Sequence, residues 1–195
     1  LGGSIGVAAG ERIARAFEKA TSRRVPIVLV CSTSGTRMQE GLLALMQAPR
    51  IAAAAQRHDR AGLPYVAVLT DPTTGSAYTG FVNLADIIVA EPNALVGYTA
   101  LRSLQEATGE ALPAGAHTSE AHLKRGLIDA VVPRPQLRES LAQLLDLPDE
   151  VAGEAFATSD LAASAFAVSG PVASLAGSGL AGSIFGSSIF ASSVL

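Results

Sequence analysis

The chain has 195 residues, of which 49% are hydrophobic, 16% charged and 5% aromatic. This length and hydrophobicity suit one domain with a sizeable core and exclude disorder of the whole chain. The formal net charge of -3 argues against a nucleic-acid-binding protein, which normally carries an excess of Lys and Arg. A single cysteine, Cys31, excludes an internal disulfide and favours a reducing, cytoplasmic setting.

The first 60 residues predict a helix, a strand and a second helix. Apolar residues at helical spacing predict a helix over residues 7–23. A run rich in β-branched residues at 25–31 predicts a strand buried on both faces, and the turn STSGT follows at 32–36. Residues 37–60 predict the second helix. Its apolar stripe consists of Met38, Leu42, Leu45 and Met46.

The alternation continues to about residue 148. The pattern predicts a strand at 64–69, a turn at 70–76, a helical segment through Phe81 and Leu84, strands at 86–90, 94–96 and 127–132, and helices at 118–125 and 133–145. Thr118 is the expected N-cap of the helix at 118–125, and Gly126 ends it. Residues 1–148 are therefore predicted to form one layered α/β domain.

Residues 149–195 are predicted to be an Ala/Ser/Gly-rich low-complexity tail. From residue 161 onward there are 35 residues without a charge. A flexible tail, or one ordered only against a partner, is the favoured interpretation. A subunit-packing segment is a second interpretation. A membrane span is the least favoured, because 15 of the 35 residues are Ser, Gly or Pro.

Two segments have the order strand, glycine-containing turn, helix. Gly35 lies in the first turn (32–36) and Gly75 in the second (70–76). Backbone N–H groups at such a turn, next to a helix N-terminus, suit a carbonyl oxygen that gains negative charge during a reaction. The same pattern is also typical of ordinary tight connections in α/β folds.

Other chemistry is weakly supported. His58, His117 and His122 have polar neighbours in the sequence and are expected to be solvated surface residues. Cys31 is expected to be a small core residue, and Ser34 lacks the context of a nucleophile elbow. No metal-ligand spacing, phosphate-binding motif or dinucleotide motif is present.

Five strings of the sequence carry a more specific signal. They are LGGSIGVAAGERI, STSGTRMQEGLLALMQ, AGLPYVAVLTDPTTG, ADIIVAEPNALVGY and HTSEAHLKRGLIDAVV, in this order. Together they resemble the carboxyltransferase β subunits of acetyl-CoA carboxylases and the N-terminal half of related acyl-CoA carboxylases. The resemblance covers about residues 1–145. It implies an α/β crotonase-like fold, a spiral of ββα units, here expected to lack its N-terminal part.

The resemblance also implies an activity. Members of this family transfer a carboxyl group from carboxybiotin, held on a carrier protein, to acetyl-CoA or a short acyl-CoA, which gives malonyl-CoA or a homologue for fatty-acid synthesis. The implied partners are a carboxyltransferase α-type subunit or domain, a biotin carboxyl carrier protein and biotin carboxylase, in a homo- or hetero-oligomer. No metal is expected in this chain. Alternatives are another crotonase-fold acyl-CoA enzyme (a hydrolase, isomerase or decarboxylase) and a non-catalytic carboxylase paralogue.

The family pattern assigns roles to residues of both turns. The N–H groups of Gly35 and Thr36 would form the oxyanion hole, and Arg37 would brace the first turn by pairing with Glu40. The remaining implied substrate-binding residues are Gly2, Gly3 and Ser4 at the CoA-side entrance, Ser34, and Thr73, Thr74, Gly75 and Ser76 along the pocket wall. A general base is not expected among them, because the ureido nitrogen of carboxybiotin can take the proton.

The sequence departs from the family pattern at three places. Ser34 and Ser76 stand where the family has glycine, and residues 99–102 read TALR where it has AGPR. A lost glycine matters where the backbone needs a positive φ or where substrate presses on it. These departures bear on activity and acyl-chain preference. The zinc ribbon of β subunits and the second crotonase-like half are not in this sequence, so the chain is expected to be catalytically incomplete alone.

Overall fold

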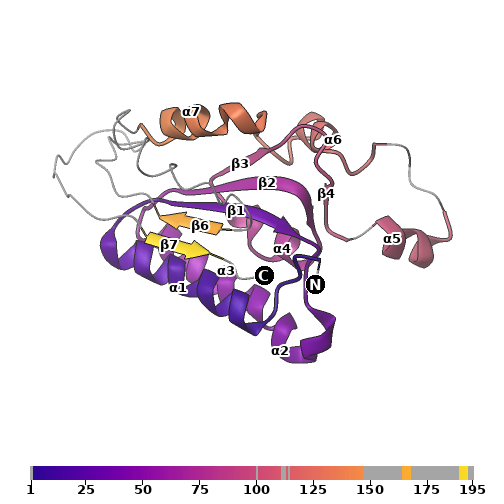
Figure 1. The fold of residues 1–195 in the computed structure, drawn as a ribbon, viewed down its shortest axis with the longest axis horizontal. Helices are drawn as coiled ribbons and strands as arrows, with labels where there is room; N and C mark the ends of the chain where they lie inside the picture. Colours follow the sequence, from indigo (N-terminus) through magenta and orange to yellow (C-terminus); the bar gives the residue numbers. More distant parts are fainter. Residues whose placement is uncertain are drawn as a thin grey trace.

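A single sheet with helices on both faces organises the chain. The computed structural model describes residues 2–99, 101–110, 113, 115–146, 164–167 and 189–192. Its elements are α1 (Val7–Arg23), β1 (Ile27–Thr33), the short 3-10 helix η1 (Met38–Glu40), α2 (Gly41–Leu45), α3 (Gln47–Arg60), β2 (Tyr65–Thr74), α4 (Ser76–Gly80), the 3-10 helix η2 (Val82–Leu84), β3 (Ile87–Ala90), β4 (Val96–Gly97), α5 (Leu101–Thr108), α6 (Ser119–Lys124), β5 (Ala130–Val131), α7 (Arg134–Leu144), β6 (Ser164–Ala167) and β7 (Ile189–Ser192). Figure 1 shows α1 and α3 on one side of the sheet and α7 on the other.

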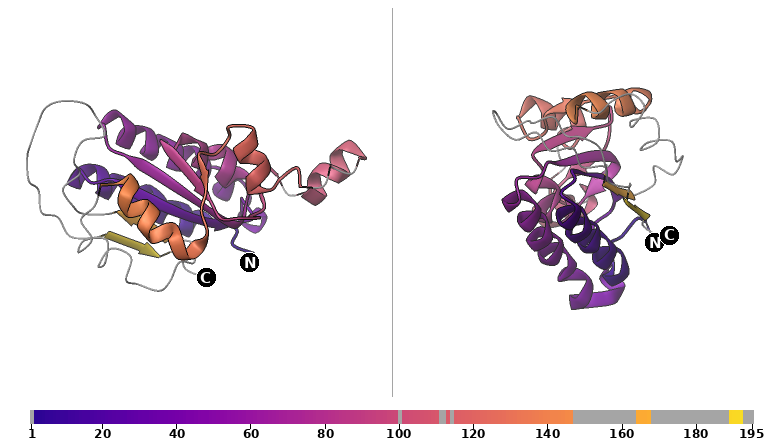
Figure 2. Two further views of the ribbon diagram at one scale, coloured as in Figure 1. Left: turned by 90° about the horizontal axis from the view of Figure 1, so that it is seen from above. Right: turned by 90° about the vertical axis from the view of Figure 1, so that its left-hand side faces the viewer.

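The strands follow the order β5-β3-β2-β1-β6-β7, and β4 also pairs with β2. The pairs formed among β1 to β5 are parallel, whereas β6 runs antiparallel to β1 and β7 antiparallel to β6. Because parallel strands end at the same edge of a sheet, the turns that follow β1 and β2 come together there. The two views of Figure 2 show that edge beside the N-terminus.

The core has two layers, one on each face of the sheet. Residues of β1 alternate between them: Ile27, Leu29 and Cys31 face the larger layer under α1 and α3, and Val28 and Val30 face the smaller layer under α7. This alternation confirms the prediction of a strand buried on both faces. Burial raises the pKa of the Cys31 thiol to about 12, which agrees with the expected core role.

Phe17 is, with Phe81, one of the two largest fully buried side chains of the layer under α1. Its ring lies edge-on to Tyr65, with 4.9 Å between centroids, and to His58, with 5.8 Å. The packing of these rings fixes α1 over the sheet.

The predicted helices at 7–23, 118–125 and 133–145 are confirmed as α1, α6 and α7. The side chain of Thr118 accepts a hydrogen bond from the Ala121 N–H, as expected of an N-cap. The predicted strands at 25–31, 64–69 and 86–90 are confirmed as β1, β2 and β3, with shifted ends.

Four element predictions need correction. The helix predicted at 37–60 is broken into η1, α2 and α3, with Gly41 at a positive φ of 56°. β2 continues to Thr74, through most of the predicted second turn, because Thr73 and Thr74 pair with β4. The strand predicted at 127–132 shrinks to the two residues of β5. The sequence pattern missed α5.

Within the predicted tail, β6 and β7 extend the sheet beyond β1. The other residues after 146 lie outside the described ranges, so the domain boundary at 148 stays a prediction. No helix in the described part of the chain is long and apolar enough to cross a membrane.

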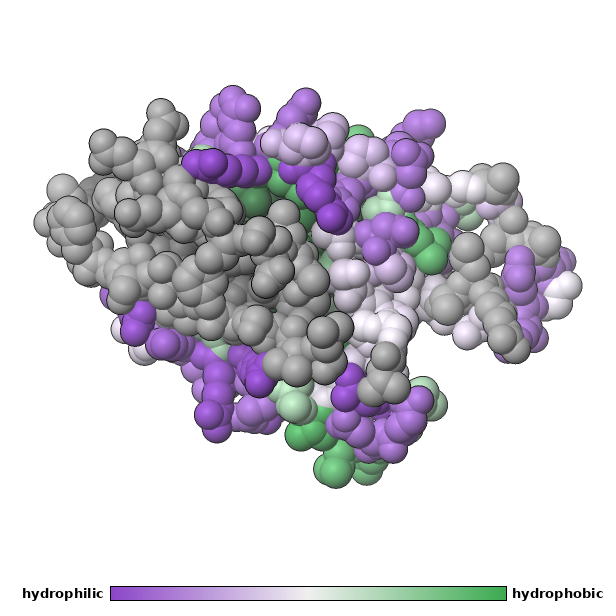
Figure 3. Space-filling view, viewed as in Figure 1, coloured by the Kyte–Doolittle hydropathy of each residue, from purple (hydrophilic) through white to green (hydrophobic). Residues whose placement is uncertain are grey.

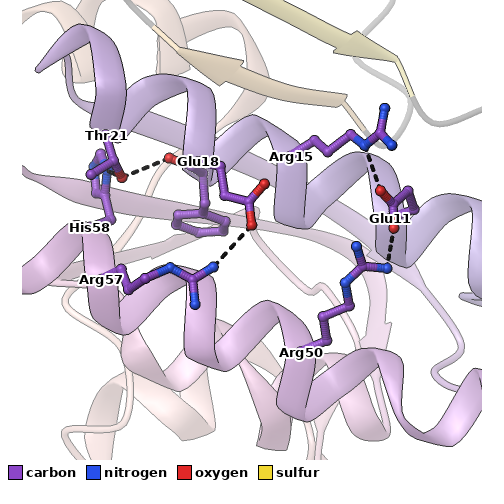
Figure 4. A network of polar contacts seen from close by, with 8 residues as sticks. Glu11, Arg15, Glu18, Thr21, Arg50, Arg57 and His58 are labelled. Atoms are coloured by element: carbon purple, nitrogen blue, oxygen red, sulfur yellow. Dashed lines mark hydrogen bonds and ion pairs between the residues drawn. The ribbon is translucent and has the colours of Figure 1, made fainter.

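Exposed ion pairs join α1 to α3 (Figure 4). Glu11 of α1 binds both Arg15, at 2.5 Å, and Arg50 of α3. Two turns further along, Glu18 binds Arg57 at 3.0 Å. Because such pairs are solvated, they contribute little to stability and mainly fix the alignment of the two helices.

His58 is fully buried, so its assignment as a solvated surface residue is wrong. It lies on the inner face of α3, with Nδ1 3.0 Å from the Thr21 hydroxyl and Nε2 3.2 Å from the Pro64 carbonyl oxygen. A carbonyl only accepts, so Nε2 carries the proton of the neutral ring. Burial lowers the pKa of His58, and this effect outweighs the Pro64 contact.

The stability of the fold is therefore expected to fall on mild acidification. Below about pH 6.5 the unfolded chain protonates His58, whereas the folded chain resists it. The contribution of His58 to the free energy of unfolding is fully present above that pH. It is lost as the pH falls, by at most about 1.4 kcal/mol per pH unit. Urea unfolding at pH 7.5 and 5.5 measures the loss, which should be smaller in His58→Gln. Equal losses in both proteins would rule out this cause.

Candidate active site

The two glycine turns touch each other through their backbones. Gly35 has a φ of 100° and Gly75 a φ of 71°. A Cβ added to Gly35 would lie 3.2 Å from the Cα of Gly75, and one added to Gly75 would lie 3.1 Å from the Cα of Gly35. Both the backbone conformation and the close approach therefore require glycine. The turns that the sequence places far apart form one structural unit.

The second turn is anchored from two sides. The Thr73 hydroxyl lies 2.8 Å from the carbonyl oxygens of both Cys31 and Thr70. The Gly75 N–H donates to the carbonyl of Gly97 in β4 at 3.0 Å. Thr73 and Thr74 are both buried. Their side chains therefore support the second turn from inside the protein and do not contact solvent.

The amides of the first turn point in different directions. The Ile5 N–H donates to the Gly35 carbonyl at 2.7 Å, and the Arg37 N–H donates to the Ile5 carbonyl at 2.9 Å. In this parallel bridge the N–H of Thr36 points away from Ile5. The Gly35 N–H donates to the Thr33 hydroxyl at 3.0 Å. A substrate oxygen must replace that hydroxyl to use the Gly35 amide.

Hydroxyl groups also link the turns. The Thr36 and Ser76 hydroxyl oxygens lie 2.5 Å apart. Neither Ser34 nor Ser76 has a positive φ, since the described non-glycine residues with one are Arg24, Asn93 and Asp146. Serine at these two positions therefore costs no left-handed backbone strain. Ser34 is exposed, and Ser76 is half-buried.

The N-terminal loop packs against the first turn. A Cβ on Gly3 would lie 2.8 Å from the carbonyl oxygen of Ser32, and one on Gly2 would lie 3.6 Å from the Ser34 hydroxyl. Arg37 donates to the carbonyl oxygen of Ser4 at 2.9 Å and to its hydroxyl at 3.2 Å. The loop is thus held beside the turns, next to the position predicted for the pocket entrance.

Glu40 completes this brace. Arg37 donates to its Oε1 at 3.1 Å, which confirms the predicted pair. Its Oε2 accepts from the Val7 N–H at 2.6 Å, at the start of α1. The Val7 contact lowers the pKa of Glu40 most, and Arg37 lowers it further. One carboxylate therefore joins the first turn, the N-terminal loop and α1.

The structure brings together every residue that the sequence assigned to the pocket. The set comprises Gly2, Gly3, Ser4, Ser34, Gly35, Thr36, Arg37, Thr73, Thr74, Gly75 and Ser76. The third departure, at 99–102, lies after β4 and includes Ala100, which is outside the described residues. Among the described residues, no group of three His, Cys, Asp or Glu side chains could hold a metal ion.

Sequence reasoning missed two features beside the turns. His117 and His122 are buried, so their assignment as solvated surface residues is wrong. They pack behind the second turn, where the Tyr78 hydroxyl lies 3.0 Å from His122 Nδ1. Ser119 and His122 are spaced i, i+3, so they lie on the same face of α6, and this face is buried. This spacing was the signal for burial that the sequence offered.

The second missed feature is an apolar surface on η1, α2 and the start of α3. Met38, Leu42, Leu45 and Met46 were expected to form an apolar stripe of one helix, yet their exposures are 81%, 70%, 54% and 53%. Leu43 is 68% exposed. Figure 3 shows hydrophobic spheres at the lower end of the molecule, where Figure 1 places α2. We call these five residues the α2 surface. Such clusters on soluble proteins mark interaction sites.

Known proteins share this architecture. The model of the carboxyl transferase domain family matches residues 1–144. The chain is 48% identical over 147 residues to the acetyl-coenzyme A carboxylase carboxyl transferase subunit beta of Crocosphaera subtropica, covering 75% of this chain and 46% of that protein. The chain thus spans about half the length of the curated relatives it matches.

Solved structures agree. The chain superposes on the Pseudomonas malonate decarboxylase MdcD-MdcE hetero-dimer with a TM-score of 0.68 and 26% identity, covering 76% of this chain and 68% of that one. An enoyl-CoA hydratase from Mycobacterium avium subsp. paratuberculosis shares the fold, with a TM-score of 0.51 and 22% identity over 73% of this chain and 68% of that one. The predicted crotonase-like fold is confirmed, and the chain belongs to the carboxyl transferase domain family.

Proposed function

We propose that this chain is the β-type half of a carboxyltransferase and moves a carboxyl group from carboxybiotin to acetyl-CoA or a short acyl-CoA. In this reaction the α-carbon of the thioester loses a proton and bonds to the carboxyl carbon, while the bond from that carbon to the biotin nitrogen breaks and the nitrogen takes the proton. Charge builds up on the thioester oxygen. The observation that supports this function most is the backbone contact of the Gly35 and Gly75 turns.

The turns contribute main-chain hydrogen-bond donors to that oxygen. The Thr36 N–H faces away from the N-terminal loop, and the Gly35 N–H is held by a hydroxyl that a stronger acceptor can displace. A negatively charged oxygen is such an acceptor. Fixed donors of this kind typically lower a barrier by about 3 kcal/mol each. The Arg37–Glu40 brace keeps the Thr36 amide in place.

Removing the Thr33 hydroxyl tests this arrangement. Thr33→Val leaves the buried Gly35 N–H without its acceptor, which is expected to cost the free protein about 1–3 kcal/mol. A bound acyl-CoA oxygen then satisfies that amide, so acetyl-CoA should stabilise Thr33→Val more than it stabilises the wild type. Thermal unfolding with and without acetyl-CoA measures this difference.

Thr70→Val is the matched control. It also removes a buried hydroxyl, but this hydroxyl donates to the Cys31 carbonyl oxygen, whereas that of Thr33 accepts from a turn amide. Acetyl-CoA should stabilise this variant no more than the wild type. Equal stabilisation of Thr33→Val and Thr70→Val would contradict the role of the Gly35 amide.

We propose that an α-type carboxyltransferase subunit completes the site. The α2 surface supports this partner, because it begins directly after the first turn and exposes five large apolar side chains. A partner bound there would cover one side of the pocket and exclude water from it. The remaining proposed components are a biotin carboxyl carrier protein and biotin carboxylase, with the whole complex in the cytoplasm.

Reconstitution tests the proposal. The chain, mixed with an α-type subunit and carboxylated carrier protein, should form malonyl-CoA from acetyl-CoA, and neither subunit alone should do so. Leu42→Glu should abolish binding of the α-type subunit. Leu84→Glu, a substitution at a half-exposed leucine of η2, is the control and should leave binding unchanged. Full binding of Leu42→Glu would refute the assigned surface.

The match to a malonate decarboxylase favours a second candidate, an acyl-CoA decarboxylase. The same turns would stabilise the enolate that forms when CO2 leaves. Loss of CO2 from malonyl-CoA without any biotin component would support the decarboxylase. Acetyl-CoA binding without turnover in either assay would indicate a non-catalytic paralogue.

A further inference from the structure

Two buried imidazoles lie behind the second glycine turn. His117 precedes α6 and is 8% exposed, and His122 lies within α6 and is 5% exposed. Their ring centroids are 6.2 Å apart. We propose that His117 and His122 are positioning residues that hold the second turn against the first and thereby set the affinity of the pocket for an acyl-CoA thioester. This proposal deepens the proposed function and rests on it.

His122 connects α6 to the helix that starts at the second turn. Its Nδ1 lies 3.0 Å from the Tyr78 hydroxyl, and the two rings meet edge-on with 5.4 Å between centroids. Tyr78 belongs to α4, two residues after Ser76. A shift of His122 would therefore move the start of α4 and, with it, Ser76.

His117 acts on the other support of the turn. A Cβ on Gly97 would lie 2.1 Å from His117 Nδ1, so the imidazole packs directly on the backbone of β4. The His117 carbonyl also accepts a hydrogen bond from the Val96 N–H at 2.8 Å. Contacts thus run from His117 to Gly97, from Gly97 to Gly75, and from Gly75 to Gly35.

The surroundings of His122 disfavour a positive charge. His117 Nδ1 has no hydrogen-bond partner in the described part of the chain, and it faces the Cα of Gly97. Burial lowers the pKa of His122 most, and His117 and Arg125 lower it further. Tyr78, whose pKa burial raises, and Tyr98 complete the ring cluster.

Nearby carboxylates are engaged elsewhere. Glu120 of α6 accepts hydrogen bonds from the Asn93 N–H at 2.8 Å and from the Ser119 hydroxyl at 3.3 Å. The Asn93 contact lowers its pKa most. Protonation of His122 would therefore put a positive charge beside His117 and beside Arg125. The resulting repulsion would push α6 away from α4 and β4.

Hydrogen exchange tests the positioning without any ligand. The Gly75 N–H, which donates to Gly97, is expected to exchange at least 10-fold faster in His122→Leu and in Tyr78→Phe than in the wild type, after correction for intrinsic rates. The Val68 N–H in the middle of β2 is the internal control and should keep its protection. In the wild type the Gly75 protection should also fall between pH 7.5 and 5.5. Unchanged Gly75 protection in both variants and at both pH values would overturn the proposal.

Acetyl-CoA binding to the full chain gives the second readout. The dissociation constant should rise about 10-fold in His122→Leu, and with an α-type subunit present KM should rise while kcat stays within about 2-fold. His58→Gln is the matched control, because His58 is also buried but contacts Thr21 of α1 and Pro64, which precedes β2, and not the turns. It should change stability and leave the dissociation constant unchanged.

A double substitution separates the effect of the His117 contact on binding from general destabilisation of the fold. Gly97→Ala should weaken acetyl-CoA binding through the clash with the imidazole, and His117→Ala in the same chain should restore part of the affinity. Absence of any restoration would overturn the role of His117. If the wild type does not bind acetyl-CoA at all, the proposed function is wrong. The exchange rate of the Gly75 N–H then still shows whether the histidines position the second turn.

Discussion

Gly35→Ala is expected to lower the rate of carboxyl transfer by about 100-fold or more. The added methyl group would lie 3.2 Å from the Cα of Gly75 and 3.3 Å from the Ser76 nitrogen, so the two turns must separate. The φ of 100° adds strain that alanine does not tolerate. In the proposed reaction, displacement of the amides would remove stabilisation of the thioester oxygen, and the loss of one such donor typically costs about 100- to 1,000-fold. The measurement is kcat/KM of the reconstituted complex.

Gly41→Ala provides the control for backbone strain alone. Gly41 also has a positive φ, but a Cβ there would meet no atom within 4 Å. This variant should lose some stability and keep most of the kcat/KM. If both variants lose activity equally, strain and not the contact between the turns explains the effect.

Phe17→Ala is expected to destabilise the fold by about 3–5 kcal/mol. The ring is fully buried between α1 and the sheet and meets Tyr65 and His58 edge-on, so its removal leaves a cavity and breaks both ring contacts. Urea denaturation of the full chain measures the change in the free energy of unfolding.

Leu127→Ala serves as the comparison, because Leu127 is 48% exposed and its removal creates no buried cavity. Its effect should stay below about 1 kcal/mol. A loss at Phe17 no larger than this would mean that α1 repacks on the sheet without the ring.

The buried strands and the long helices could be predicted because their patterns are local. The β-branched run of β1 and the helical spacing of α1 depend on residues within one element. The prediction of one helix over 37–60 with a buried apolar stripe was wrong, because Gly41 allows the chain to turn and the leucines of α2 face outward. Local hydrophobicity does not tell a core stripe from an exposed surface.

The sequence could predict which residues lie at the two turns, but not the contacts among them. Both turns were visible as strand, glycine and helix. The approach of Gly35 to Gly75 depends on the pairing of β1 with β2, which brings residues 40 positions apart together. The burial of His117 and His122 was not predicted for the same reason. Tyr78, the partner of His122, lies 44 positions away in the sequence, and Gly97, the partner of His117, lies 20 positions away.

The contact between Gly35 and Gly75 has a consequence for the design of new substrate preferences. Gly35 and Gly75 meet through their backbones, and the neighbouring positions 34 and 76 can change side chain without a left-handed conformation to preserve. Ser34 is exposed beside the Gly2–Gly3 loop, and Ser76 makes a single hydroxyl contact with Thr36. On the proposed function, a library that varies these two positions is therefore expected to widen or narrow the range of acyl groups accepted.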